Sequence, residues 1–188
     1  NSGVYVAGAA PLIAEHRHIL EVRELDARFD RYLYKYETGR RVPIAYFLKI
    51  LARLDIKTSD DRLSGYFVMS ASGTGKLPAQ YTVTPTLAKI LGYLVSEGTI
   101  SEKIAIISNT DAEVISDACS ALRLLDIQHF TTPKSIVLSD IAFVTFLAAV
   151  GMREKSGSKR VPGIVYESPQ EVQSAFLAAY FEGDGGVD

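Results

Sequence analysis

The sequence is poor in cysteine and in long apolar runs, and both shortages exclude classes of protein. Its 188 residues include one cysteine, Cys119. A single cysteine excludes an internal disulfide framework and a zinc site built from several thiolates. The longest apolar run, "IAFVTFLAAVGM", is too short to cross a membrane, and no basic segment followed by an apolar one marks a secretory signal. We therefore expect an intracellular protein, cytoplasmic or nucleoid-associated, that contacts no membrane.

An excess of positive charge is also missing. The chain has 20 Lys and Arg against 22 Asp and Glu, a net charge of −2, whereas a dedicated nucleic-acid binder is commonly basic. The charges are unevenly spread, because residues 31–57 carry seven basic side chains and two acidic ones. Such a segment can bind a phosphate backbone although the whole chain is nearly neutral. The ordinary alternative is a solvated face.

Turn residues divide the chain near residue 80. Residues 1–80 are predicted to be mainly helical, with an extended segment over residues 1–10 and an amphipathic helix that opens at Pro43. The stretch "SGTGKLPAQ" is predicted to be the loop that ends this region. Residues 81–188 are predicted to be α+β with a small sheet, whose strands include "KIAIIS" and "HFTTPKSIVLS".

Helix starts in the second region carry recognisable signals. Thr110 with Glu113, and Ser168 with Glu171, have the spacing of a capping box. Each pair is followed by apolar residues at helical spacing. We therefore predict helices that begin at these two points.

Two glycine-rich stretches match known ligand loops only in part. "SASGTGKL" contains the Gly-Lys pair of a phosphate-binding loop, but Ser70 stands where glycine is needed and Leu77 where a hydroxyl is needed. "EGDGGVD" has the acids and glycine of a calcium loop without its bidentate glutamate. Neither stretch is favoured as a site.

A stronger pattern appears when two segments are aligned. "LAKILGYLVSEGTI" (87–100) and "SAFLAAYFEGDGGV" (174–187) are apolar, have small residues four apart, and end in an acid followed by glycine. Small residues four apart allow two helices to approach closely. The alignment predicts a helix interface formed by Gly92, Ser96, Ala179 and Gly183.

The same alignment places Glu97 beside Asp184. Two carboxylates that meet at helix ends are costly without a cation, and hard divalent ions take oxygen ligands. We therefore expect Glu97 and Asp184 to bind a metal ion. The alternative, two ordinary polar helix ends, is less favoured because the pattern occurs twice in one short chain.

These segments resemble the LAGLIDADG, or dodecapeptide, homing endonucleases, and most closely those embedded in inteins. "LAKILGYLVSEG" resembles the first motif and "FLAAYFEGDG" the second, with "KRVP" and "SP" elements between them. The similarity covers residues 84–188 and extends faintly to "VPIAYFLKILARLDI". It implies an α+β saddle of αββα-type repeats, in which the two motif helices pack together and the sheets line the DNA.

The resemblance implies a site-specific endonuclease that hydrolyses phosphodiester bonds in both strands of a long double-stranded DNA site, with Mg²⁺ or Mn²⁺. Glu97 and Asp184 would be its catalytic, metal-binding acids, and Lys159 of "KRVP" its catalytic lysine. Sheet residues after the motif helix would contact DNA, with two arginines of the basic segment as an accessory surface. These candidates are Thr99, Ser101, Lys103, His129, Thr131, Lys134, Arg40 and Arg41.

The second repeat is expected to be truncated, since the sequence stops just after the second motif. We expect the remainder of the same parent chain to complete a monomeric pseudo-dimer, and this chain alone to bind weakly and not to cut. No splicing residues are recognisable, so the expectation concerns the endonuclease module. The alternative is a non-cutting nucleic-acid-binding protein on the same scaffold, either a transcription regulator or an RNA-splicing maturase, because fold does not fix function. The two retained carboxylates favour the nuclease.

Overall fold

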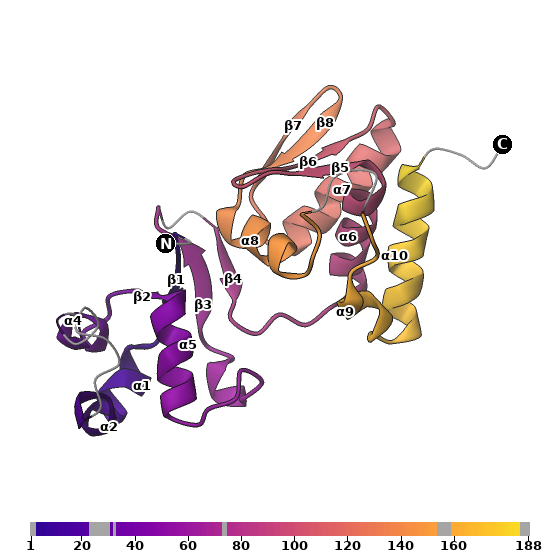
Figure 1. Cartoon of the computed structure of the whole chain (residues 1–188). Coiled ribbons are helices and arrows are strands. Elements are labelled where there is room, and N and C mark those ends of the chain that lie inside the picture. Colours follow the sequence, from indigo (N-terminus) through magenta and orange to yellow (C-terminus); the bar gives the residue numbers. More distant parts are fainter. Residues whose placement is uncertain (1–2, 23–30, 32, 73–74, 154–158, 185–188) are drawn as a thin grey trace. The chain divides into compact units, whose positions relative to one another are not determined.

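The computed structural model describes residues 3–22, 31, 33–72, 75–153 and 159–184. It forms two compact units, Asn1–Tyr81 and Thr82–Asp188 (Figure 1). In the described part of the chain, no helix is long and apolar enough to cross a membrane.

The N-terminal unit contains a four-stranded antiparallel sheet with spatial order β2-β1-β3-β4. The strands are β1 (Val4–Ala7), β2 (Val42–Pro43), β3 (Phe67–Ser70) and β4 (Lys76–Pro78). The helices are α1 (Ala10–Glu15), α2 (Arg17–Val22), α4 (Leu33–Glu37), α5 (Ile44–Arg53) and the 3-10 helix η1 (Asp61–Leu63). The prediction of a mainly helical region therefore missed a sheet, since the segment predicted as extended and the predicted loop both contribute strands.

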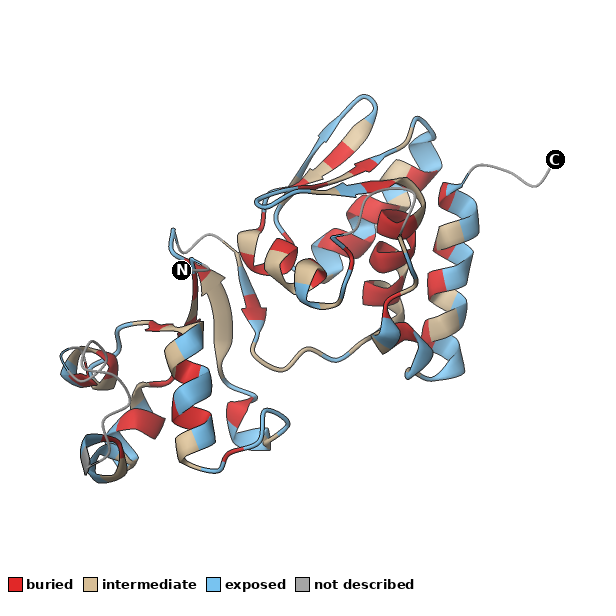
Figure 2. Ribbon diagram, viewed as in Figure 1, coloured by how far each residue is buried: buried red, intermediate tan, exposed pale blue. Residues whose placement is uncertain are grey.

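Alternation along β1 explains why this sheet forms. Val4 and Val6 are each 1% exposed, whereas Tyr5 and Ala7, which alternate with them, are half-buried. The buried face packs with α1 and α5 in one apolar core (Figure 2). A four-residue strand with two core positions gives little local signal, because its partners lie far along the chain.

The C-terminal unit is α+β, as predicted. Its sheet has the spatial order β5-β6-β8-β7, with every neighbouring pair antiparallel. The strands are β5 (Gly98–Ile100), β6 (Ala105–Ser108), β7 (His129–Thr132) and β8 (Ser135–Leu138). The helices are α6 (Pro85–Glu97), α7 (Ala112–Leu124), α8 (Ile141–Ala149), α9 (Gly163–Tyr166) and α10 (Gln170–Gly183).

One face of this sheet is core and the other is open. Ala105 and Ile107 on β6, and Ile136 and Leu138 on β8, are each at most 1% exposed. The residues between them, such as Ile106, are half-buried. Side chains alternate between the two faces of a strand, so the helices cover one face only.

The caps of three helices differ in how well the sequence predicted them. Asp111, not Thr110, caps α7, where its carboxylate accepts the Glu113 main-chain N–H at 2.7 Å. The predicted box at Ser168 is also wrong, because that hydroxyl donates to the Ile164 carbonyl at 2.7 Å. Thr84 caps α6, where its hydroxyl accepts the Leu87 main-chain N–H at 3.2 Å. An aspartate one residue later is an equally good cap and adds a charge that suits the helix dipole.

Asp140 caps α8 from a buried position. It is 1% exposed, and its Oδ1 accepts the main-chain N–H groups of Ala142 and Phe143 at 3.0 and 3.1 Å. Its Oδ2 has no hydrogen-bond partner among the described residues. Burial therefore raises the pKa of this carboxyl group above its ordinary value.

Candidate functional site

Helices α6 and α10 pack against each other at very short range. A Cβ atom at Gly92 would lie 3.0 Å from the Ala179 Cβ and 3.1 Å from the Tyr180 nitrogen, and closer still to the Phe176 carbonyl oxygen. Main-chain atoms of α10 therefore occupy the space that any side chain at Gly92 would need. Glycine is required here by the close approach of two backbones.

A second contact lies one turn further along both helices. The Ser96 hydroxyl fills the place where Gly183 would carry a Cβ, and it donates to the Gly92 and Tyr93 carbonyls at 3.2 Å each. The structure thus brings together Gly92, Ser96, Ala179 and Gly183, in the register of the aligned segments. Both helices advance in the same direction past these contacts, so they end side by side.

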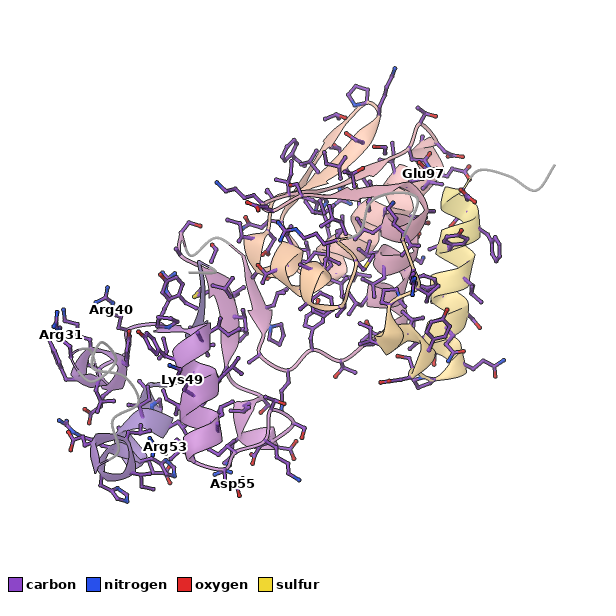
Figure 3. All side chains as sticks on the ribbon, in the orientation of Figure 1. Arg31, Arg40, Lys49, Arg53, Asp55 and Glu97 are labelled. Carbon is purple, nitrogen blue, oxygen red and sulfur yellow. The ribbon has the colours of Figure 1, made fainter. Side chains whose placement is uncertain are left out.

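Each helix presents a carboxylate at this shared end. Glu97 is the last residue of α6 and is half-buried (Figure 3), and Asp184 is the exposed C-cap residue of α10. Their neighbours Ser96 and Gly183 are in contact. Both acids therefore lie at the same end of the helix pair.

The donor set at this point suits only some metal ions. Among the described residues, no three His, Cys, Asp or Glu side chains gather as metal ligands. Structural and catalytic zinc sites use three or four protein ligands. Mg²⁺ is commonly held by one or two carboxylates and keeps several waters, so a pair such as Glu97 and Asp184 fits it.

Lys159 binds the end of α6. Its Nζ donates to the Leu94 and Val95 carbonyls at 3.2 Å each, and also to the Gly98 carbonyl. Carbonyls in the last turn of a helix have no partner within the helix, so Lys159 acts as its cap. Burial lowers the pKa of Lys159, and the Glu97 carboxylate opposes this shift. An ammonium group has three N–H bonds and so can serve these three carbonyl oxygens.

A buried phenol links α6 to two other helices. Tyr93 is fully buried, and its hydroxyl lies 2.8 Å from Asp117 Oδ2 on α7 and 2.7 Å from Glu182 Oε2 on α10. Lys89 donates to the other Asp117 oxygen at 2.9 Å. Burial, and then the two carboxylates, raise the pKa of the Tyr93 phenol. These hydrogen bonds add a polar link to the close packing of the helices. In the sequence, the one sign of this link is a tyrosine within an apolar helical segment.

Asn109 was also missed by the sequence reasoning. It follows β6, its side-chain nitrogen lies 3.5 Å from the Gly183 carbonyl oxygen, and its main-chain N–H donates to the Lys134 carbonyl at 3.2 Å. The end of β6 and the β7–β8 turn therefore lie next to the acidic end of α10.

The open face of the sheet carries one row of side chains across all four strands. Thr99 pairs with Ile106, Ile106 with Val137, and Val137 with Phe130. Phe130 is 55% exposed and Thr99 is exposed. Thr99 therefore lies where the sequence reasoning placed it, within an apolar row that was not foreseen.

Two other predicted DNA contacts point to the opposite face. His129 pairs with Leu138 and Thr131 with Ile136, and both of these partners are core residues. A shift of one residue along a strand reverses the face, so Phe130, not its neighbours, shares the open face. Which residues of β7 share the open face follows from the alternation of buried and half-buried residues along its partner β8.

The remaining candidates of this unit lie in turns. The Ser101 hydroxyl donates to the Ile104 carbonyl at 2.9 Å and so supports the β5–β6 turn, where Lys103 is exposed. Lys134 is exposed in the β7–β8 turn. Ser108, at the end of β6, pairs with Ser135. Lys134 therefore lies at the end of the sheet that is next to Glu97 and Asp184, and Lys103 lies at the opposite end.

Arg40 and Arg41 belong to the N-terminal unit. Arg40 is exposed, and Arg41 is half-buried and donates from Nη1 to the carbonyls of Ser70 and Ala71 at 3.1 and 3.4 Å. They line a hollow in that unit, whereas the two carboxylates belong to the other.

No protein-family model matches the chain. Among curated proteins, it is 24% identical over 155 residues to a reverse gyrase of Methanocaldococcus jannaschii, covering 81% of this chain and 9% of that protein. It is 33% identical over 109 residues to the large subunit of a DNA polymerase II of Thermococcus kodakarensis, covering 54% and 6%. It is 26% identical over 170 residues to one of the subunits of the A-type ATP synthase of Pyrococcus horikoshii, covering 83% and 18%. The chain thus spans less than a fifth of each of these relatives.

Proposed function

We propose that residues 84–188 are the first repeat and second motif helix of a LAGLIDADG site-specific DNA endonuclease of the kind embedded in inteins. The observation that carries this proposal is the parallel packing of α6 and α10 through Gly92 and Gly183. This packing places Glu97 and Asp184 at one end of the pair. A helix pair built only for stability would have no need of two carboxylates at its shared end.

The relatives support an inserted element in particular. Their names denote a reverse gyrase, part of a DNA polymerase and part of an ATP synthase, which share no single activity. The matches to the first and third cover 81% and 83% of this chain, so they overlap over most of it. One similar segment within proteins of different function is what a mobile insertion produces. A DNA-related role is the coarser conclusion, which the first two names favour.

The proposed chemistry assigns a role to each group. Glu97 and Asp184 would hold Mg²⁺ or Mn²⁺, which when bound supplies a positive charge that orients water and stabilises the leaving oxygen. Lys159 keeps the last turn of α6 closed, so that Glu97 is held in place, and adds positive charge near the scissile phosphate. Because its Nζ lies against main-chain carbonyl oxygens, we assign Lys159 the role of a fixed positive charge.

The proposed DNA surface is the open face of the sheet. Thr99 lies on it, and Lys134 borders it at the acidic end. Phosphate contacts would set the register on DNA, and groups of the open face would read the bases.

A second repeat would complete the saddle. On α10, Leu177 and Phe181 are 48% and 61% exposed, one turn apart. Covering such a pair would remove apolar surface from water. The partner in this proposal is the second repeat of the parent protein.

The test is cleavage of a plasmid that carries the uninterrupted insertion site by the complete gene product containing this chain. We expect Mg²⁺-dependent double-strand cleavage, which Glu97→Gln or Asp184→Asn reduces by about 100-fold or more. The control is Glu102→Gln, which makes the same change at an exposed side chain in the β5–β6 turn.

Cleavage that survives both substitutions would overturn the site assignment. Tight, specific DNA binding without cleavage by the unaltered protein would overturn the nuclease and favour the non-cutting regulator or maturase.

A further inference from the structure

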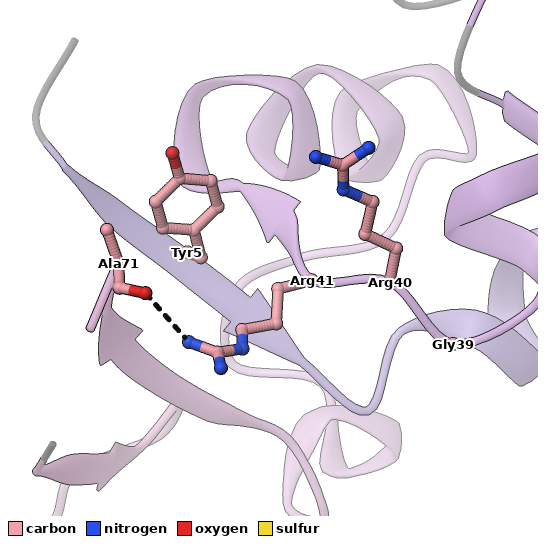
Figure 4. A pocket seen from close by; sticks show the side chains of 5 residues that line it. All are labelled: Tyr5, Gly39, Arg40, Arg41 and Ala71. Carbon is pink, nitrogen blue, oxygen red and sulfur yellow. Dashed lines mark hydrogen bonds between the residues drawn. The ribbon is translucent and has the colours of Figure 1, made fainter. Parts of the chain in front are cut away.

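The N-terminal unit contains a hollow of about 390 Å³ lined by basic and aromatic side chains (Figure 4). Among the described residues, its walls include Tyr5, Gly39, Arg40, Arg41 and Ala71. It lies at the β1–β2 edge of the sheet, where the chain enters β2 after α4.

A helix-ending turn fixes the two arginines. The Gly39 N–H donates to the Tyr36 carbonyl at 3.3 Å and the Arg40 N–H to the Lys35 carbonyl at 2.9 Å, the two bonds of a Schellman motif at the end of α4. Gly39 has a φ of 106°, which favours glycine at this position. The turn "TGRR" therefore has a defined backbone, which aims Arg40 and Arg41 before any ligand arrives.

Arg41 is held across the outer face of the sheet. Its Nη1 donates to the Ser70 and Ala71 carbonyls at the end of β3 (Figure 4). Pro43 pairs with Tyr5, and Arg41 precedes it by two residues, so Arg41 and Tyr5 share a face. The guanidinium group is thus pre-positioned beside the phenol.

The same outer face carries one further basic side chain. Lys76 pairs with Met69, and its ammonium group lies 4.6 Å from the centre of the Phe67 ring. On the strands of this sheet, as far as the structure describes them, no acidic side chain occurs. An anion approaching the hollow therefore meets the Arg41 guanidinium group and, on the same face of the sheet, the Lys76 ammonium group.

We propose that this hollow binds a backbone phosphate of double-stranded DNA, outside the cleavage site. Arginine forks match the geometry of phosphate oxygens, and a tyrosine hydroxyl adds a donor. Such a contact fixes position on DNA without reading sequence. That the phosphate belongs to DNA rests on the proposed function. The hollow itself lies in the N-terminal unit, whereas the proposed cleavage site lies in the C-terminal unit.

The test uses the full chain and a fluorescein-labelled duplex of random sequence, with affinity measured by anisotropy over a range of salt concentrations. Arg40→Gln is expected to weaken binding about tenfold at low salt and to reduce the slope of log K against log salt by about 0.9. Arg40→Lys is expected to restore most of the slope. Arg40 is exposed, so neither change disturbs the core.

Lys57→Gln is the matched control, because it removes one exposed charge four residues beyond the end of α5 at Arg53, which Figure 3 labels. Ten helical residues span about 15 Å, so Lys57 is remote from the hollow. Equal effects of Lys57→Gln and Arg40→Gln would overturn the proposal, as would a chain that binds no duplex.

A second arm separates DNA from a free anion. Inorganic phosphate is titrated while the NMR signals of the Tyr5 ring are followed. Saturable shifts, together with duplex binding that does not respond to Arg40→Gln, would mean a free-phosphate site and overturn the proposal. Binding that depends on Arg40, together with a complete gene product that does not cut its insertion site, would overturn the proposed function and leave this inference standing.

Discussion

The substitution Gly92→Ala adds one methyl group where α6 and α10 touch. The new carbon would lie 3.0 Å from the Ala179 Cβ and 3.1 Å from the Tyr180 nitrogen, and against the Phe176 carbonyl oxygen. Two of these three neighbours are main-chain atoms inside a helix, which cannot turn aside as a side chain can. The helices must therefore move apart.

Two opposing effects set the size of the change. Alanine is favoured over glycine inside a helix by about 1 kcal/mol. Overpacking a tight interface costs about 1–3 kcal/mol, and contacts with main-chain atoms favour the upper part of that range. We expect the clash to win, with a net loss of about 2 kcal/mol in the free energy of unfolding of the C-terminal unit.

The measurement is urea unfolding followed by circular dichroism, with amide hydrogen exchange of α6 and α10 to assign the change to this unit. Gly163→Ala is the control. Gly163 is the first residue of α9, and a Cβ there would meet no atom within 4 Å. We expect that control to leave stability unchanged or to raise it by about 0.4–1 kcal/mol.

Equal stability of the two variants would refute the reasoning, because it would mean that α6 and α10 do not approach as closely as Gly92 indicates. A loss at Gly92 without faster exchange in α10 would also count against it, since the methyl group acts on both helices.

Two further predictions concern buried charge. Lys159→Met removes the side-chain donor from the Val95 carbonyl and leaves the Leu94 carbonyl with only the Gly98 N–H. We therefore expect a loss of about 1–3 kcal/mol in urea unfolding and faster amide exchange at the end of α6; unchanged exchange there would contradict the capping role. Burial raises the pKa of Asp140 above 3.8, so its contribution to stability is present below pH 3.8 and is lost as the pH rises through the folded-state pKa. Asp140→Asn keeps an N-cap and is expected to flatten that part of the pH profile of unfolding; an unchanged profile would mean that Asp140 does not titrate as inferred.

The helix pair was predictable because its signal is local and repeated. Gly92 and Ala179 occur at matching places in the two apolar segments, as do Ser96 and Gly183, and small residues in such segments have few uses besides close packing. The α+β class followed from equally regular patterns.

The sheet of the N-terminal unit could not be predicted in the same way. β1 supplies only Val4 and Val6 to the core, and its partner β3 begins at Phe67. Pairing over such a distance depends on how the whole unit folds. Asp111 and His129 show a related difficulty. A shift of one residue changes which side chain caps α7 in the first case, and which face of the sheet the side chain occupies in the second.

The bonds of Lys159 to α6 and of Asn109 to α10 have no sequence signal of their own. Each is a side chain that meets a main-chain carbonyl of a distant segment. Such a contact depends on the loop path, which apolar periodicity does not encode.

The junction between α6 and β5 has a mechanical consequence. The helix ends at Glu97 and the strand starts at Gly98, with no loop residue between them. A Cβ at Gly98 would lie 2.6 Å from the Leu94 Cα, so the bend itself is tight. Helix α6 and strand β5 therefore rotate together as one rigid unit about the contact with α10. A change in the crossing angle of α6 and α10 would rotate the whole row of side chains that starts at Thr99. The residues buried between the two helices would thus set the orientation of the open face of the sheet.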